Sequence, residues 1–272
     1  MTIIAGFWTQ EGVLICSDTQ YTGGTKIYKQ KIFPGEITGD SYVFALAGHE
    51  GNATMAIDEC KNAIADLKPE QRTAKTVKKA LQKAIKPICD DYVLARPQNL
   101  WDELSFELLI ACWIPRGGGH NLFSVGRLGD VNRQDGGECK GTGAYIGQYV
   151  MGSVFKPILN FESVKVLAAN VLSAAKSYDP NCGGPSTFVV LDKTGKFGII
   201  PYDYLHAEQF LTTYEAQTRS LLFHLGNPEV ENEVFEKRLL EFTETMKSIR
   251  AIWKSLSDAQ KKARQSLPEQ SD

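Results

Sequence analysis

The chain has 272 residues, of which 43% are hydrophobic and 23% charged, a composition typical of a globular protein. Its 30 basic and 32 acidic residues leave a formal net charge of −2, so the basic excess of a nucleic-acid-binding protein is missing and we expect no nucleic-acid partner. The longest fully apolar run, residues 108–114, is too short to cross a membrane, and no signal-peptide pattern opens the sequence, so we expect a cytoplasmic protein without a membrane segment.

The first half of the chain begins with four predicted strands. Residues 2–8 and 12–17 are rich in β-branched and apolar side chains, and the short turn between them makes them a hairpin. Two further strands are expected over residues 26–33 and 42–47. The turn between these two is expected at Pro34, Gly35 and Gly39–Asp40.

Helices and strands then alternate in groups. Apolar residues recur every three or four positions at residues 56–67 and again at residues 77–92, which predicts two amphipathic helices separated by Pro69. The later predicted elements are strands at 106–114 and 122–125, a loop rich in glycine and aspartate up to Gly141, helices at 144–154 and 164–175, and a hairpin of 188–191 with 197–200.

This order of elements predicts the fold class. Strands are grouped with strands and helices with helices, which favours an α+β protein built in layers. Two sheets that face each other and are covered outside by helices satisfy the pattern, so we expect a four-layer αββα sandwich over residues 1–204.

Residues 205–272 are expected to form a separate C-terminal helical extension. Two helices are predicted on either side of Gly226, Asn227 and Pro228. The second helix carries apolar residues at alternating steps of four and three: Phe235, Leu239, Phe242, Met246, Ile249, Trp253 and Leu256. Two interpretations of this stripe stay open: packing on the core of the domain, or contact with another subunit or a partner.

Six short segments carry the strongest functional signal. In chain order they are TIIAG at 2–6, EGVLICSDT at 11–19, KIF at 31–33, LAGHEGNATMA at 46–56, GTGA at 141–144 and DPNCGG at 179–184. In their order and spacing they resemble the conserved segments of proteasome β subunits and their bacterial relatives. The resemblance extends from Thr2 to about Asp203 and implies the same αββα sandwich.

The resemblance also implies an N-terminal-threonine peptidase. The nucleophile would be the hydroxyl of Thr2 after removal of Met1, with the freed amine as its base. Lys31 matches the family's strand lysine, Asp18 matches the acid that pairs with it, and Gly48 lies where the family has its oxyanion-hole glycine.

Three more residues match the family's active-site turns, two of them with a change. Thr142 and Cys182 stand where serine is usual, and Asp179 is present as in the family. A thiol is a weak hydrogen-bond donor, so Cys182 affects the tuning of the threonine amine rather than the nucleophile itself.

The substrate-binding residues implied by the resemblance are Tyr21, Thr22, Lys29, Leu46 and Glu50. Tyr21 and Thr22 match the segment that holds substrate as an added strand. Tyr21, Lys29, Leu46 and Glu50 would line the pocket for the side chain before the cleaved bond. Glu50 would favour a basic side chain there and Lys29 an acidic one, and the residues alone do not decide between them.

The expected substrate is a peptide or unfolded protein, which is cleaved inside a homo-oligomeric ring. A separate ATPase or unfoldase would deliver the substrate to this ring. Two alternatives stay open: a non-catalytic ring subunit that retains Met1, and a small-molecule amidase of the N-terminal-nucleophile type. The six cysteines form no CxxC pair and the four histidines lack ligand spacing, so we expect neither a metal site nor a cofactor.

Overall fold

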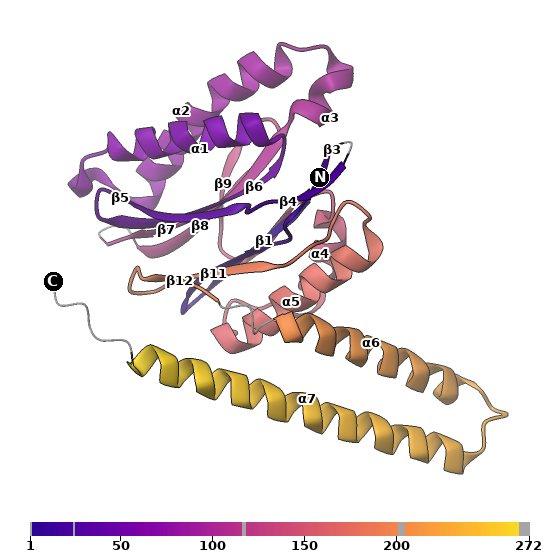
Figure 1. Cartoon of the computed structure of the whole chain (residues 1–272). Coiled ribbons are helices and arrows are strands. Elements are labelled where there is room, and N and C mark those ends of the chain that lie inside the picture. The colour runs from indigo at the N-terminus through magenta and orange to yellow at the C-terminus, as the bar shows by residue number, and fades with distance from the viewer. Residues whose placement is uncertain (1, 24, 116–117, 201–204, 267–272) are drawn as a thin grey trace. The chain divides into compact units, whose positions relative to one another are not determined.

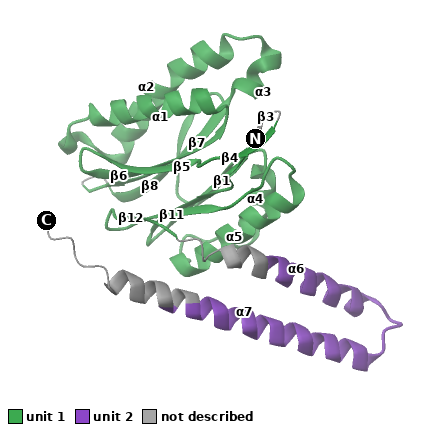
Figure 2. Ribbon diagram, viewed as in Figure 1, with its two compact units in different colours: residues 1–201 green, residues 202–272 purple. Residues whose placement is uncertain are grey.

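The computed structural model of the chain describes residues 2–23, 25–115, 118–200 and 205–266. The chain divides into two compact units, Met1–Pro201 and Tyr202–Asp272 (Figure 2). The predicted boundary at 204 falls on residues 201–204, which lie outside the described residues.

One antiparallel sheet of the first unit begins directly after Thr2. Its strand order is β10-β1-β2-β11-β12. The strands are β1 (Ile3–Thr9), β2 (Gly12–Ser17), β10 (Gly137–Gly141), β11 (Thr187–Asp192) and β12 (Phe197–Ile199). Since Gly141 at the end of β10 is paired with Ile3, the chain after β10 turns beside Thr2.

A second antiparallel sheet has the order β5-β6-β7-β8-β9. The strands are β5 (Ile32–Ile37), β6 (Asp40–Gly48), β7 (Phe106–Ile114), β8 (Gly119–Val125) and β9 (Val131–Gln134). A small hairpin of β3 (Gln20–Gly23) and β4 (Thr25–Tyr28) connects the two sheets in sequence.

Helices cover the outer face of each sheet. α1 (Glu50–Ala65) and α2 (Ala74–Ile88) lie over the sheet of β5 to β9, and α4 (Ala144–Val154) and α5 (Phe161–Tyr178) lie over the sheet of β1 and β2 (Figure 1). A π-helical turn (Cys89–Leu94) extends α2, and the short α3 (Trp101–Leu104) precedes β7. The four-layer αββα sandwich predicted from the element order is confirmed.

Two apolar clusters hold these layers together. Between the sheets, buried side chains from both sheets meet, among them Ile4, Ile15 and Leu109. Beneath α1 and α2, Phe44 and Leu81 belong to a second buried cluster. Burying such side chains stabilises the fold by about 1.5–3 kcal/mol each, so the cluster between the sheets holds the two sheets together.

The strand predictions need two corrections. The single strand expected at 26–33 is two strands, β4 and β5, which belong to different sheets. β5 continues through Pro34 and Gly35, and the chain turns at Thr38 and Gly39, where φ is +49° and +87°. Proline is tolerated there because β5 is an edge strand and needs no N–H on its outer side.

A third correction concerns the region before Gly141. The sequence predicts a loop there, but the region contains β9 and β10. Both strands are short and polar, so they lack the alternation of buried residues that marks a strand in the sequence. Their partners β8 and β1 give them their extended form.

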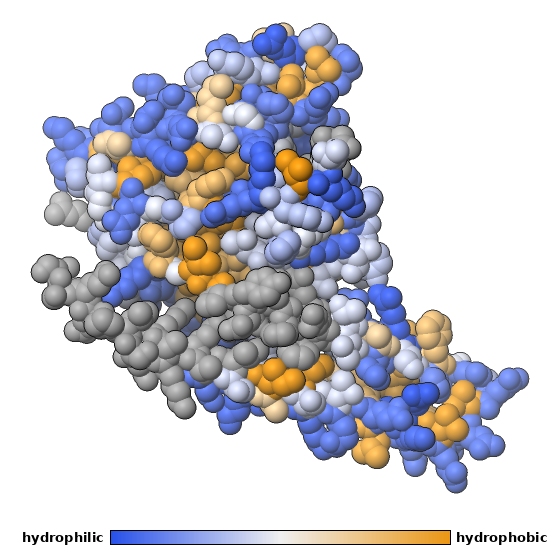
Figure 3. Space-filling model, in the orientation of Figure 1, coloured by the Kyte–Doolittle hydropathy of each residue, from blue (hydrophilic) through white to orange (hydrophobic). Residues whose placement is uncertain are grey.

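The second unit is a pair of helices, α6 (Leu205–Gly226) and α7 (Asn232–Ser266). Tyr214 of α6 packs against Phe242 of α7, with ring centroids 6.5 Å apart, so part of the apolar stripe of α7 contacts α6. The side chain of Leu256 lies outside the described residues. Hydrophobic side chains interrupt the polar surface of this unit (Figure 3). Leu222, Phe223 and Leu240 are among its exposed hydrophobic residues.

Within the described residues, no helix has the length and hydropathy that crossing a membrane requires.

Candidate active site

Thr2, Asp18 and Lys31 form one buried polar cluster. The Thr2 hydroxyl donates to Asp18 Oδ1 and accepts from Lys31 Nζ. The Lys31 ammonium lies 2.7 Å from Asp18 Oδ1. Thr2 is 2% exposed and the other two side chains are fully buried. Three residues predicted from separate segments are therefore brought into direct contact.

The strands explain why these three side chains meet. Asp18 follows the last residue of β2, which is paired with β1, and its backbone N–H donates to Ile3 O at 3.3 Å. Lys31 immediately precedes β5, and its carbonyl accepts from Leu46 N of β6 at 3.0 Å. Each charged residue lies at the end of a strand, so the cluster occupies the same end of both sheets.

Lys31 keeps its place through several partners. Its ammonium also donates to Gln20 O at 2.5 Å and lies 4.8 Å from the centroid of the Tyr21 ring. Burial lowers the pKa of Lys31 below its usual value, and the neighbouring Asp18 carboxylate opposes that shift. The ion pair is the reason that a lysine can be buried here at all.

The turn after β10 holds the backbone of Thr2. Gly143 N donates to Thr2 O at 3.3 Å, and the Thr142 hydroxyl donates to the same oxygen at 3.4 Å. Gly141 has φ +94°, and a Cβ there would lie 2.2 Å from Thr2 O. The turn therefore needs glycine at 141, and the hydroxyl of Thr142 points to the carbonyl of Thr2.

The loop of residues 179–184 forms another wall of the cluster. Gly183 N donates to Asp18 Oδ2 at 2.9 Å, and Gln20 Nε2 donates to Pro180 O at 2.9 Å. The Cys182 thiol contacts Asp179 Oδ2 at 3.7 Å. Burial, with the nearby carboxylates, raises the pKa of Cys182 to about 12, so the group is a neutral thiol at pH 7.

Gly48 lies at the exposed end of β6. Its φ is +91°, and a Cβ there would lie 2.4 Å from Ser105 O, so a side chain is excluded by both conformation and space. The preceding residue, Ala47, is close to the Thr2 turn, since a Cβ on Gly141 would lie 3.3 Å from Ala47 Cβ. This end of β6 therefore lies beside the turn that holds Thr2.

The two charged residues predicted for the substrate pocket are paired with each other. Lys29 Nζ lies 2.8 Å from Glu50 Oε2, and each side chain is almost half exposed. Glu50 is the first residue of α1, whose N-terminus is capped by His49 Nδ1 accepting from Asn52 N. Lys29 Nζ also lies 5.7 Å from the centroid of the Tyr21 ring.

Leu46 and Thr22 are the other residues predicted to bind substrate, Leu46 in the pocket and Thr22 in the segment that holds the substrate backbone. Leu46 is 1% exposed and belongs to the same buried apolar cluster as Tyr21, so it lies under the surface. The backbone of Thr22 is in β3, paired with Lys26, and its side chain lies outside the described residues.

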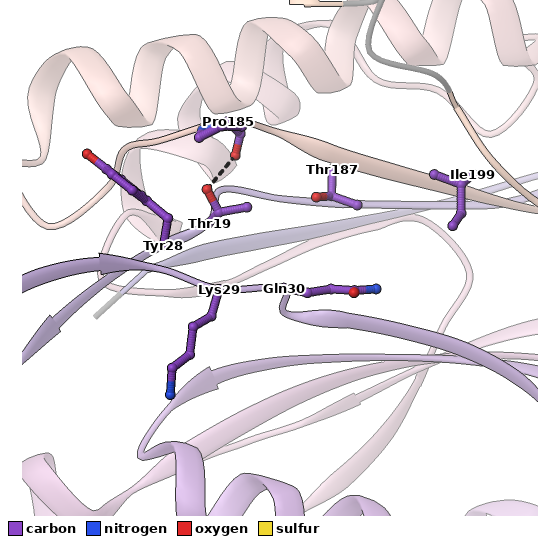
Figure 4. A pocket seen from close by; sticks show the side chains of 7 residues that line it. All are labelled: Thr19, Tyr28, Lys29, Gln30, Pro185, Thr187 and Ile199. Atoms are coloured by element: carbon purple, nitrogen blue, oxygen red, sulfur yellow. Dashed lines mark hydrogen bonds between the residues drawn. The ribbon is translucent and has the colours of Figure 1, made fainter.

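A groove of about 370 Å³ is lined in part by Thr19 and Gln30, the chain neighbours of Asp18 and Lys31 (Figure 4). Its lining residues are Thr19, Tyr28, Lys29, Gln30, Pro185, Thr187 and Ile199. The Thr19 hydroxyl donates to Pro185 O at 2.9 Å across one end of it. The Lys29 side chain points away from Pro185 and Thr187, so its ion pair with Glu50 is not part of this groove (Figure 4).

Two contacts of the site involve residues that the sequence analysis does not predict as site residues. Gly183 supplies the backbone N–H to Asp18, and Glu107 of β7 accepts from Gly141 N at 2.9 Å. Gly183 lies inside a matching segment, but a backbone donor leaves no side-chain signal. Glu107 does leave one, because it is a lone carboxylate at the second position of an otherwise apolar strand.

Among the described residues, no group of three or more histidine, cysteine, aspartate or glutamate side chains is placed to hold a metal ion. All six cysteines are buried. The cluster itself offers a hydroxyl, a carboxylate and an ammonium group.

Comparisons with known proteins agree with this geometry. Residues 2–191 match the family model described as "Proteasome subunit". The chain is 25% identical over 191 residues to proteasome subunit beta type-9 of Salmo salar, covering 68% of this chain and 79% of the salmon protein. It is 26% identical over 194 residues to the protein of the same name from Oncorhynchus mykiss, with the same coverage.

Solved structures share the fold. The Anbu complex of Pseudomonas aeruginosa, described as a helical assembly, superposes with a TM-score of 0.68 at 13% identity, over 83% of this chain and 98% of that one. Anbu (ancestral beta-subunit) from Yersinia bercovieri superposes with a TM-score of 0.65 at 12% identity, over 84% and 99% of the two chains.

Proposed function

The chain belongs to the proteasome subunit family, and we propose that it is a threonine-type peptidase in which Thr2 is the nucleophile. The observation that carries the proposal is the contact of the Thr2 hydroxyl with both Lys31 and Asp18 in a buried cluster. The Thr2–Asp18–Lys31 arrangement resembles the catalytic group of N-terminal-nucleophile hydrolases.

The proposed reaction begins at the Thr2 hydroxyl. Its oxygen adds to the carbonyl carbon of the substrate peptide bond, and the α-amine of Thr2 accepts the hydroxyl proton. The Lys31 ammonium donates to the same oxygen, which stabilises the negative charge that grows on it. Asp18 keeps Lys31 charged in its buried position.

Breakdown of the adduct completes the cycle. The carbon–nitrogen bond breaks, the protonated amine passes its proton to the leaving amine, and an ester joins the substrate acyl group to Thr2. Water then adds to the ester with the amine as base, which releases the carboxylic acid and restores the hydroxyl. Gly48 N–H is the proposed donor to the oxyanion, and Thr142, Asp179 and Cys182 are proposed to set the position of Thr2 and its turn.

For substrate binding, we propose that the surface around the Lys29–Glu50 pair receives the side chain before the cleaved bond. The pair has no net charge, and Tyr21 presents its ring beside Lys29. Such a pocket favours an uncharged side chain, because Lys29 would repel a basic side chain and Glu50 would repel an acidic one. The edge of β3 at Tyr21 and Thr22 is proposed to bind the substrate backbone.

We also propose a homo-oligomer that encloses the site and receives peptide or unfolded substrate from a separate ATPase or unfoldase. A helical assembly is described for the Anbu complex of Pseudomonas aeruginosa. The deciding experiment for the whole proposal is turnover of a fluorogenic peptide by protein that begins at Thr2, compared with a Thr2→Ala variant. Hydrolysis that persists in the variant would contradict it.

A further inference from the structure

Glu107 connects the two sheets next to the active-site threonine. It lies in β7 opposite Ala47, and its neighbour Phe106 is opposite Gly48. Its carboxylate reaches out of that sheet to the other one, where Oε2 accepts from Gly141 N at 2.9 Å. Glu107, which lies in the same sheet as Gly48, is thus hydrogen-bonded to the turn that holds Thr2.

The surroundings of Glu107 hold its carboxylate in one position. The side chain is only 15% exposed, and its position in an apolar strand would be costly without partners. Arg127 and Lys140 each place a nitrogen 3.9 Å from the carboxylate. The contacts with Gly141 N, Arg127 and Lys140 together fix the direction of the carboxylate.

Gly141 is in direct contact with Thr2. Its Cα packs against the Thr2 carbonyl so closely that a Cβ would lie 2.2 Å from that oxygen. The next two residues, Thr142 and Gly143, both donate to the same carbonyl oxygen. If Gly141 shifts, these donors and the Thr2 backbone shift with it.

We propose that Glu107 is a positioning residue, which sets the distance between the Thr2 turn and the end of β6 at Gly48. The inference rests on the proposed peptidase function. Glu107 does not contact the substrate in this proposal, and it acts only through its hydrogen bond with the Gly141 N–H. A misplacement of about 1 Å in a reacting group can lower a rate by about a hundredfold, so loss of this bond should be visible in kcat.

Two substitutions separate the effect of the length of the Glu107 side chain from the effect of its charge. Glu107→Gln keeps the length of the side chain and an acceptor oxygen for Gly141 N, but removes the charge. Glu107→Asp keeps the charge and is one methylene shorter, so it loses the bond. The positioning role predicts that kcat falls about tenfold or more in Glu107→Asp with KM unchanged, and stays within about threefold of wild type in Glu107→Gln.

Glu138 supplies the matched control. It lies on β10, is 20% exposed, and its carboxylate is 3.4 Å from Lys140, the residue that also faces Glu107. Its other partner is the Gln148 amide at 3.3 Å. Glu138→Gln and Glu138→Asp should both keep kcat within about twofold, since neither of the two contacts of Glu138 is with Gly141 or the turn that holds Thr2.

Hydrogen exchange at the amide of Gly141 gives a readout that does not need activity. We expect faster exchange in Glu107→Asp and wild-type exchange in Glu107→Gln. Equal kcat in Glu107→Asp and wild type, or a Gln variant as slow as the Asp variant, would overturn the positioning role. If wild-type protein beginning at Thr2 hydrolyses no peptide, the peptidase proposal fails, and the exchange pattern alone then supports or overturns the role of Glu107.

Discussion

The Lys31 ammonium lies 2.7 Å from the Asp18 carboxylate, and both side chains are fully buried. Such a pair is held together because either partner alone would be an uncompensated charge in the interior, at a cost of about 3–5 kcal/mol. The same geometry keeps a cation against the Thr2 hydroxyl, so the structural and the proposed catalytic demands on this pair coincide.

The first prediction concerns the nucleophile. Thr2→Ala removes the hydroxyl but leaves the Lys31–Asp18 pair intact, so we expect a folded protein whose peptide hydrolysis falls by several orders of magnitude. Thr2→Ser is the control, because it keeps a hydroxyl and should keep measurable turnover. Fluorogenic-peptide kinetics, with thermal unfolding of each variant, measure both effects.

Lys31 is tested separately because its removal also affects stability. Lys31→Ala should abolish hydrolysis, and the unpaired Asp18 should lower the free energy of unfolding by about 3–5 kcal/mol. Lys31→Met with Asp18→Asn removes both charges, so it should recover stability without recovering activity. Activity in a folded variant that lacks the Lys31 ammonium would argue against its proposed role.

Part of the site could be predicted from the sequence, and the reason is visible in the structure. Thr2, Asp18 and Lys31 each lie at a strand end, and short motifs mark strand ends well. Neither composition nor periodicity would have joined them, because their contact depends on how two sheets face each other. The resemblance of six ordered segments supplied that long-range information.

Other features depend on contacts that a linear pattern does not contain. From the sequence, Lys29 implies a pocket for an acidic side chain and Glu50 a pocket for a basic one. Only the structure shows that the two side chains form an ion pair with each other. β10 could not be predicted, because its five residues are polar and glycine-rich and its form comes from β1. The hydrogen bond from Gly141 N to Glu107 could not be predicted either, because it joins β10 to a strand of the other sheet.

The Lys29–Glu50 pair makes a prediction about specificity. Wild type should prefer an uncharged side chain before the cleaved bond. Lys29→Met leaves Glu50 unpaired and should shift kcat/KM toward basic side chains, whereas Glu50→Gln should shift it toward acidic ones. Both groups are almost half exposed, so each shift should be modest, about fivefold.

The double variant is the control for this pair. Lys29→Met with Glu50→Gln should show no preference between basic and acidic side chains, as in wild type. A panel of fluorogenic peptides that differ only at the residue before the cleaved bond measures all four proteins. Identical preferences in both single variants would place the pocket elsewhere.

Cys182 stands where a stronger donor would be expected. Its neutral thiol contacts Asp179 at 3.7 Å, so Cys182→Ser should keep or raise kcat by supplying a better donor to the same carboxylate. Cys182→Ala supplies none and should be the slower variant. A loss of more than about tenfold in the Ser variant, about 1.4 kcal/mol of barrier, would show that the sulfur itself has a role.

Assembly is testable by native mass spectrometry. The exposed hydrophobic residues of the second unit, such as Phe223 and Leu240, are candidates for contact between copies. We expect a homo-oligomer at micromolar concentration, with the distribution shifting on dilution. A species of 30.1 kDa alone at that concentration would contradict the enclosed-chamber proposal.

The last prediction concerns the nitrogen of Thr2. With Met1 attached, this atom is an amide and cannot accept the hydroxyl proton, so the proposed reaction would have no base. A free α-amine has an ordinary pKa of about 7.7–8.0, which leaves a useful neutral fraction at pH 7. We therefore expect the protein isolated from cells to begin at Thr2, as intact-mass measurement can show. Two preparations supply the functional comparison, one cleaved to begin at Thr2 and one with a single glycine before it, and only the first should hydrolyse peptides. Equal turnover by both would exclude the amine as base, and a cellular mass that includes the full methionine would instead favour a non-catalytic ring subunit.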